Sequence, residues 1–192
     1  RDLHLYIRRQ RQMCLRDSPG TTIMGFGLIK VVGNKMNLLL LNELVLNKYD
    51  DHYLRLKHIF ERTIDLIEKY HPDEISIEAP FFGKNVQSML KLGRAQGVAM
   101  AAGLSKEIPI TEYSPKKIKM SITGSGNASK EQVAKMLQSL LHIKTLPKNL
   151  DSTDGLAAAV CHFYNQNNKL SSEKNYSGWG AFVKQNEKRI KK

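Results

Sequence analysis

The sequence predicts an α/β fold in which a mixed sheet is flanked by helices, and three observations support this. Two apolar runs separated by a turn signal lie early in the chain, at 21–32 and 36–45. Helical and strand-like segments alternate from residue 52 to residue 113, and the remaining ordered segments are helical. No internal repeat is visible. A meander followed by crossover connections places antiparallel and parallel strands in one sheet.

The amino-terminal part begins with a basic stretch. Residues 1–16 contain five Arg and one Asp, which interrupt the apolar positions so often that we expect a weakly structured segment. A turn signal follows at 17–20, and the run at 21–32 is rich in β-forming residues. With the second run at 36–45 it predicts a β-hairpin.

The middle and the carboxy-terminal part contain the remaining elements. Apolar residues at helical spacing predict an amphipathic helix over 52–70, which His71 and Pro72 end. Ser129 and Gln132 form a capping box that opens another helix. The other expected elements are a strand at 75–78 that stops at Pro80, a helix at 86–104, a strand at 108–113, a Lys-rich segment at 115–122 and a last helix at 150–164.

Length and charge limit the possible organisation. The 192 residues fit one domain, over 17–164, between the basic segment 1–16 and a basic, flexible tail at 165–192. The formal net charge of +12 favours a polyanionic partner, and the eight Lys against three Glu within 106–150 predict a basic patch on the fold itself.

Cysteine usage and hydropathy predict the location. Cys14 and Cys161 are far apart and belong to no CxxC motif, so we expect neither a disulfide framework nor a zinc site, and a reducing compartment. No apolar run approaches the ~20 residues of a membrane span. The sequence therefore predicts a cytoplasmic protein without a membrane partner.

Carboxylates in the pattern of a metal site are the main functional signal. Glu78 lies at the tip of a strand, where chemistry collects in α/β sheets. Asp151 and Asp154 are three residues apart in the first turn of the last helix. With an acid near the start of the first strand, they would form an all-oxygen cluster that suits Mg²⁺ or Mn²⁺, and an ion pair there can promote phosphodiester hydrolysis. A solvated Glu78 and an aspartate that only caps the helix are the simpler alternatives.

Two further motifs carry weaker signals. Gly124-Ser125-Gly126 lacks the third Gly of a dinucleotide loop and the Gly-Lys-Ser/Thr of a P-loop, so it favours contact with a nucleic-acid phosphate over a nucleotide site. Phe81 and Phe82 follow the strand-end acid after Ala79 and Pro80, so they either belong to the core or stack on a base.

Taken together, these residues resemble the RuvC Holliday junction resolvases. The resemblance covers about 19–162 and is carried by Ile77-Glu78, Phe81, Lys84-Asn85, the block Leu90-Lys91-Leu92-Gly93-Arg94-Ala95-Gln96-Gly97, Glu112-Tyr113, Lys119, Gly124 and Gly126, Lys130 and Asp151-x-x-Asp154-Gly-Leu-Ala. It implies a ribonuclease H-like nuclease domain, a homodimer, and magnesium-dependent symmetrical nicking of four-way DNA junctions in recombination and repair. It also implies the RuvA–RuvB branch-migration complex as a partner.

The resemblance assigns roles to individual residues. Glu78, Asp151 and Asp154 match three of the four catalytic acids that hold the Mg²⁺ ions, two per active site, for which Mn²⁺ substitutes. Phe81 matches the aromatic residue that wedges into the junction, and Lys119 and Lys130 match cations that contact the DNA backbone.

The first acid departs from the family pattern. The family places this acid immediately before Pro-Gly, where this chain has Ser18, and Asp17 is one residue early. A shift by one residue turns a side chain to the other face of a strand. We expect Asp17 to be the fourth catalytic and metal-binding acid, delivered by a local bulge. The alternative is that the first residues are altered, for instance by a reading-frame change, and that activity is impaired.

Two other functions remain as alternatives. A junction-DNA-binding protein of the same fold would keep binding but lose cleavage through the change at Asp17 and Ser18. The sequence Pro19-Gly20-Thr21-Thr22 is also similar to the phosphate loop of actin-like and sugar kinase ATPases. Those enzymes need a second domain that closes on the nucleotide, and this chain is too short for one.

Overall fold

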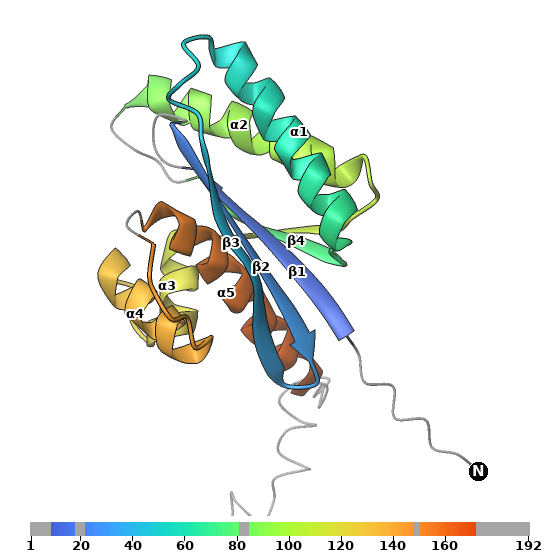
Figure 1. The fold of residues 1–192 in the computed structure, drawn as a ribbon. Helices are drawn as coiled ribbons and strands as arrows, with labels where there is room; N and C mark the ends of the chain where they lie inside the picture. The colour runs from blue at the N-terminus through green and yellow to red at the C-terminus, as the bar shows by residue number, and fades with distance from the viewer. Residues whose placement is uncertain (1–8, 18–21, 81–84, 148–149, 172–192) are drawn as a thin grey trace, which may run out of the picture.

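The computed structural model describes residues 9–17, 22–80, 85–147 and 150–171. A five-stranded sheet in the order β3-β2-β1-β4-β5 forms the centre, with helices on both faces (Figure 1). The elements are β1 (Arg9–Asp17), β2 (Ile23–Val32), β3 (Lys35–Val45), α1 (His52–Tyr70), β4 (Glu74–Glu78), α2 (Val86–Leu104), β5 (Ile110–Tyr113), α3 (Pro115–Thr123), α4 (Lys130–Leu140) and α5 (Asp151–Ser171).

The sheet is mixed, as the sequence predicts. β1 pairs antiparallel with β2, and β2 pairs antiparallel with β3, so the predicted hairpin is confirmed. β4 runs parallel to β1, and β5 runs parallel to β4. The carboxyl ends of β1, β4 and β5 therefore lie at one edge of the sheet, which is the ligand-binding edge in α/β folds.

The expectation of a weakly structured segment 1–16 is wrong for residues 9–16. They form most of β1, the central strand, which bonds to β2 on one side and to β4 on the other. The arginines misled the prediction because β1 begins at the periphery. There Arg11 donates from its backbone N–H to Asp73 and from its guanidinium to the carbonyl of Tyr70 at the end of α1. Tertiary pairing thus outweighs the local sequence pattern.

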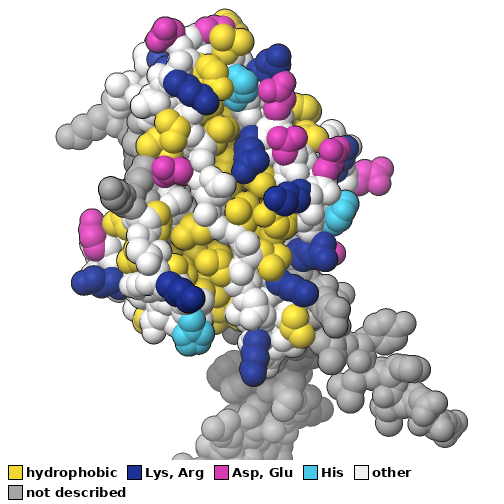
Figure 2. All heavy atoms as spheres, in the orientation of Figure 1, with side chains coloured by type: hydrophobic (Ala, Val, Ile, Leu, Met, Phe, Trp, Pro, Cys, Tyr) yellow, Lys and Arg dark blue, Asp and Glu magenta, His cyan; other side chains and the backbone are white. Residues whose placement is uncertain are grey.

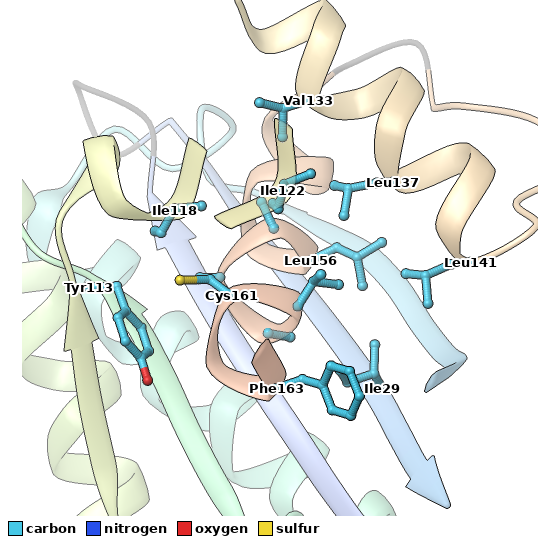
Figure 3. Packing of buried hydrophobic residues seen from close by; sticks show 14 of the residues in the cluster. Ile29, Tyr113, Ile118, Ile122, Val133, Leu137, Leu141, Leu156, Cys161 and Phe163 are labelled. Carbon is cyan, nitrogen blue, oxygen red and sulfur yellow. The ribbon is translucent and has the colours of Figure 1, made fainter. Parts of the chain in front are cut away.

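Helices cover the two faces of the sheet unequally. α1 and α2 lie on one face, and α3, α4 and α5 lie on the other (Figure 1). Met13, Phe26 and Ile77 belong to the buried cluster under α1 and α2. Ile29 and Tyr113 belong to the cluster around α5, in which α3 and α4 contribute Ile118, Ile122, Val133 and Leu137 (Figure 3). Alternate residues of each strand serve alternate faces.

α5 packs directly against the backbone of β2. A Cβ added at Gly27 would lie 2.4 Å from the Cα of Leu156, and one added at Gly155 would lie 2.9 Å from the carbonyl oxygen of Gly25. Only glycine allows this approach, because any side chain at either position would collide with backbone. The amino-terminal end of α5 is therefore held at a fixed distance from the sheet.

The remaining element predictions are confirmed or corrected as follows. The helix at 52–70 has the predicted bounds, and the capping box of Ser129 and Gln132 is present. The Lys-rich segment is a helix, α3. α5 continues to Ser171, so the boundary of the flexible tail at residue 165 is wrong for 165–171. None of the helices in the described ranges is long and apolar enough to cross a membrane.

Candidate functional site

Glu78 and Asp154 meet at the carboxyl edge of the sheet, as the sequence predicts. Glu78 is the last residue of β4 and is 5% exposed, and Asp154 lies in the first turn of α5 and is 4% exposed. Both side chains line one cavity of about 60 Å³. Two carboxylates so deeply buried need compensating cations or hydrogen bonds, because an uncompensated buried charge is costly.

The backbone around Glu78 is fixed from both sides. The side-chain amide of Gln96, which is buried on α2, donates to the carbonyl of Glu78 at 2.9 Å. The N–H of Ala79 donates to the carbonyl of Tyr113 at 2.8 Å. Sequence reasoning took Gln96 only as part of a motif, because nothing in the sequence indicates which strand end it reaches.

Lys119 and Lys130 lie in the same cavity as the two acids. The ammonium of Lys130 is 3.2 Å from a carboxylate oxygen of Asp154, while its side chain stays 43% exposed. A lysine with one side toward a buried carboxylate and the other toward solvent can neutralise the acid and still reach an anionic ligand. This position agrees with the predicted contact of both lysines with the DNA backbone.

The first acid is described only through its backbone. Asp17 ends β1, opposite Met24 near the start of β2, the strand that the sequence predicts at 21–32. Leu15 is level with Ile77 on β4, so the next residue, Arg16, comes level with Glu78. The backbone pairing of β1 continues to Asp17 without a bulge in the described residues.

Other predicted site residues lie partly or wholly outside the described residues. Asp151 is the first residue of α5, one turn before Asp154, but its side chain is outside the described part, as is that of Asp17. Ser18 and Phe81 lie outside the described residues altogether. Among the described side chains, no three residues that can bind a metal lie close enough together to hold one ion. The side chains of Asp17 and Asp151, two of the four predicted acids, are not among those described.

The donor set that is described fits a hard divalent cation. Glu78 and Asp154 offer only carboxylate oxygens, and these are the ligands that Mg²⁺ and Mn²⁺ prefer. Cys161, further along α5, is unsuited to bind metal or act as a nucleophile, because burial raises the pKa of its thiol.

A second, larger groove is also lined by residues of α4. It has a volume of about 640 Å³ and is formed by the loop after α3 and by α4, with Thr123, Ser125, Asn127, Gln132, Lys135 and Met136 among its lining residues. Gly124, which has a φ of 75°, ends α3 and turns the chain into this loop. Ser125, the middle residue of the Gly124–Gly126 motif, lines this groove, so the predicted phosphate contact would lie at its edge.

Sequence reasoning missed a partly buried polar network that centres on Glu74, at the opposite end of β4 from Glu78. Tyr113, His162, Glu74 and Gln166 are joined by hydrogen bonds between β4, β5 and α5. His162 shares no motif with the other histidines in the sequence. Its position eight residues after Asp154 on the same helix was the available signal.

Comparisons with known proteins agree with this geometry. The family model described as "Crossover junction endodeoxyribonuclease RuvC" matches residues 15–162. The chain belongs to the RuvC family. Proteins of that name from Christiangramia forsetii and Bacteroides fragilis are 71% and 57% identical to it, over 96% and 95% of this chain and 96% and 97% of theirs. The structure of Thermus thermophilus RuvC in complex with a Holliday junction substrate has a TM-score of 0.74 and 28% identity, covering 81% of this chain and 94% of that one.

Family membership confirms several predictions made from the sequence. The ribonuclease H-like fold class is confirmed, and so is the class of activity, an endodeoxyribonuclease that acts at crossover junctions. The RuvC family depends on a divalent metal, in agreement with the buried carboxylates. The identity of the ion, the oligomeric state and the residue-by-residue roles are not part of that confirmation.

Proposed function

We propose that this protein cuts four-way DNA junctions by paired, symmetrical nicks at a cluster of Glu78, Asp151 and Asp154, with a fourth ligand from the end of β1. The observation that carries the proposal is the convergence of two buried carboxylates, from β4 and α5, on one cavity that two lysines also line. A structural role alone gives no reason to place two buried acids at the ligand-binding edge of the sheet.

The cluster would hold Mg²⁺, or Mn²⁺ in its place, at two ions per site. Such ions, when bound, activate a water molecule and stabilise the leaving oxygen of a phosphodiester. The contribution of the protein is to orient Glu78 and Asp154 rigidly and to exclude bulk water from them. Lys119 and Lys130 would neutralise the phosphates next to the scissile bond.

The larger groove supports an extended contact with DNA. Residues of α4 line both the groove and the cavity, and Lys130 and Lys135 lie on that helix. Figure 2 shows the acidic side chains gathered in the upper part of the displayed face, where α1 lies, with Lys and Arg prevailing below. This asymmetry suits a DNA backbone that crosses the α3–α4 side of the molecule.

A homodimer is proposed from the outer face of α2. The small residues of this helix divide into two sets, because Ala95, Ala99 and Gly103 are buried whereas Gly93 and Gly97 are exposed. A Cβ added at Gly93 or Gly97 would meet nothing within 4 Å. Leu90 and Leu104 on the same helix are 52% and 61% exposed. Two such faces would bring two sites into the twofold arrangement that paired cuts require. The RuvA–RuvB partner and the cytoplasmic location stay predictions.

A cleavage assay on a synthetic four-way junction tests the site. Asp154→Asn keeps the shape of the side chain but removes its charge, so we expect at least a hundredfold loss of cleavage with Mg²⁺ while junction binding is retained. Asp65→Asn on the exposed side of α1 is the matched control and should cleave at the parental rate. Parental cleavage by Asp154→Asn would show that the cluster is misassigned.

The second candidate function is a junction-binding protein with impaired cleavage. The sequence favours it, because the residue immediately before Pro19-Gly20, where the family pattern has the first acid, is Ser18, which provides no charge. The two candidates make opposite predictions for the parental protein in the same assay.

A further inference from the structure

The face of α5 that packs against β4 carries polar residues at both ends of the α5–β4 contact. Asp154, Ala158, His162 and Gln166 follow one another at intervals of four residues, and such residues share one face of a helix. Glu78 and Glu74 stand at the two ends of β4 on the face toward α5. Asp154 and Glu78 share the acid cavity, and His162 and Gln166 both bond to Glu74.

The spacings along the helix and the strand match. Eight helical residues from Asp154 to His162 rise about 12 Å. Four strand residues from Glu78 to Glu74 span about 13 Å. A bond at one end therefore fixes the alignment at the other, because α5 cannot slide along β4 without breaking the contact of His162 with Glu74.

Tyr113 connects this remote contact to the acid site. It ends β5 level with Glu78, and its hydroxyl lies 2.8 Å from Nδ1 of His162. Figure 3 shows the Tyr113 ring with its oxygen pointing away from Ile118 on α3. Tyr113 and His162 are 7% and 3% exposed, so both partners are held in a dry environment.

The hydrogen-bond roles are mutually consistent. A carboxylate only accepts, so Nε2 of His162 donates to Glu74, and the amide of Gln166 donates to the same oxygen. Nδ1 of a neutral imidazole is then the acceptor for the Tyr113 hydroxyl. Tyr113, His162 and Glu74 are thus linked in a chain of hydrogen bonds, which restrains the arrangement.

We propose that Tyr113, His162 and Glu74 form a positioning clamp that sets the alignment of α5 on β4 and thereby the separation of Asp154 and Glu78. Gly27 and Gly155 fix how closely α5 approaches the sheet, and the clamp fixes where along the sheet it lies. The clamp residues do not touch the substrate. The inference rests on the proposed assignment of Glu78 and Asp154 as metal ligands.

Tyr113→Phe and Glu74→Gln are the principal variants, because each keeps the shape of the side chain. Without DNA, we expect the Mn²⁺ concentration at half-saturation, measured by electron paramagnetic resonance, to rise about tenfold, in the range typical for groups that orient metal ligands. Single-turnover cleavage at saturating junction DNA should fall by a similar factor, and junction affinity without metal should stay within about twofold. Tyr164→Phe, which removes a phenol hydroxyl elsewhere on α5, is the matched control and should behave as the parent.

Two substitutions of His162 test its bonds to Glu74 and Tyr113 separately. His162→Gln keeps a donor near the place of Nε2 and His162→Asn keeps a polar group near Nδ1. His162→Gln should retain more Mn²⁺ affinity than His162→Asn, because the bond to Glu74 aligns the helix. All variants are compared below their melting transitions, so that a lower melting temperature alone does not mimic the effect.

The possible outcomes test the metal site and the clamp separately. If Asp154→Asn weakens Mn²⁺ binding but Tyr113→Phe and Glu74→Gln bind Mn²⁺ like the parent, the clamp is refuted and the metal site stands. If Asp154→Asn itself leaves Mn²⁺ binding unchanged, the metal site is misassigned and the clamp is refuted with it.

Discussion

The Lys130 ammonium lies 3.2 Å from a carboxylate oxygen of Asp154, which joins a half-exposed cation on α4 to a buried acid on α5. The side chains of the two residues are 43% and 5% exposed. This ion pair joins a predicted metal ligand to a predicted DNA-binding residue. If Lys130 contacts DNA as proposed, an incoming phosphate would compete with this carboxylate for its ammonium.

Replacing Lys130 should weaken junction binding in a salt-dependent way. A lysine that contacts a phosphate releases about one counterion, so the slope of log affinity against log salt concentration should fall by about one for Lys130→Met. Fluorescence anisotropy without divalent metal measures it. Lys57→Met, on the opposite side of the sheet, is the control and should keep the parental slope. An unchanged slope for Lys130→Met would mean that Lys130 serves Asp154 alone.

The end of β1 decides whether the parental protein is fully active. If position 18 is the place of the first acid, Ser18→Asp should raise junction cleavage with Mg²⁺ at least tenfold, and Asp17→Ala should change little. The reason is that a serine supplies no charge to the cation. If Asp17 reaches the cluster, Asp17→Ala should abolish cleavage and Ser18→Asp should bring no gain. Measuring both variants in one assay distinguishes the two positions.

The outer face of α2 should control the oligomeric state. Leu90→Glu places a charge on the exposed apolar face, and burying that charge at a dimer interface is costly. We expect multi-angle light scattering at micromolar concentration to give a dimer for the parent and a monomer for Leu90→Glu. Leu39→Glu on β3, a leucine of 38% exposure, is the control and should remain dimeric. A monomeric parent, with and without junction DNA, would contradict the proposal.

The buried side chain of Gln12, on the central strand, should lower the free energy of unfolding of the protein. It is 1% exposed, and neither atom of its side-chain amide has a hydrogen-bond partner within the described structure. Leaving a buried polar group unsatisfied costs about 1–3 kcal/mol, so Gln12→Leu should raise the free energy of unfolding by a similar amount. Urea titration measures the change. Gln138→Leu, on a less buried part of α4, should have little effect, and a loss of stability in Gln12→Leu would indicate that the amide is hydrogen bonded.

The sequence alone predicted most of the helices and a mixed sheet of antiparallel and parallel strands. Apolar spacing gave the bounds of α1 correctly, and the Ser129 capping box marked the start of α4. It also predicted that Glu78 and Asp154 would meet, because a strand tip and a helix start share the ligand-binding edge of such a fold. These predictions depend on local periodicity and capping, which act over a few residues.

The tertiary structure alone decided the rest. β1 lies at the centre of the sheet although its sequence is polar, because pairing on both sides and the contacts of Arg11 at the periphery compensate for weak local preference. The clamp of Tyr113, His162 and Glu74 joins residues 49 and 88 positions apart, a separation that leaves no periodic trace in the sequence. Local patterns determine which elements form. The alignment of one element on another depends on long-range contacts, which exist only once the chain has folded.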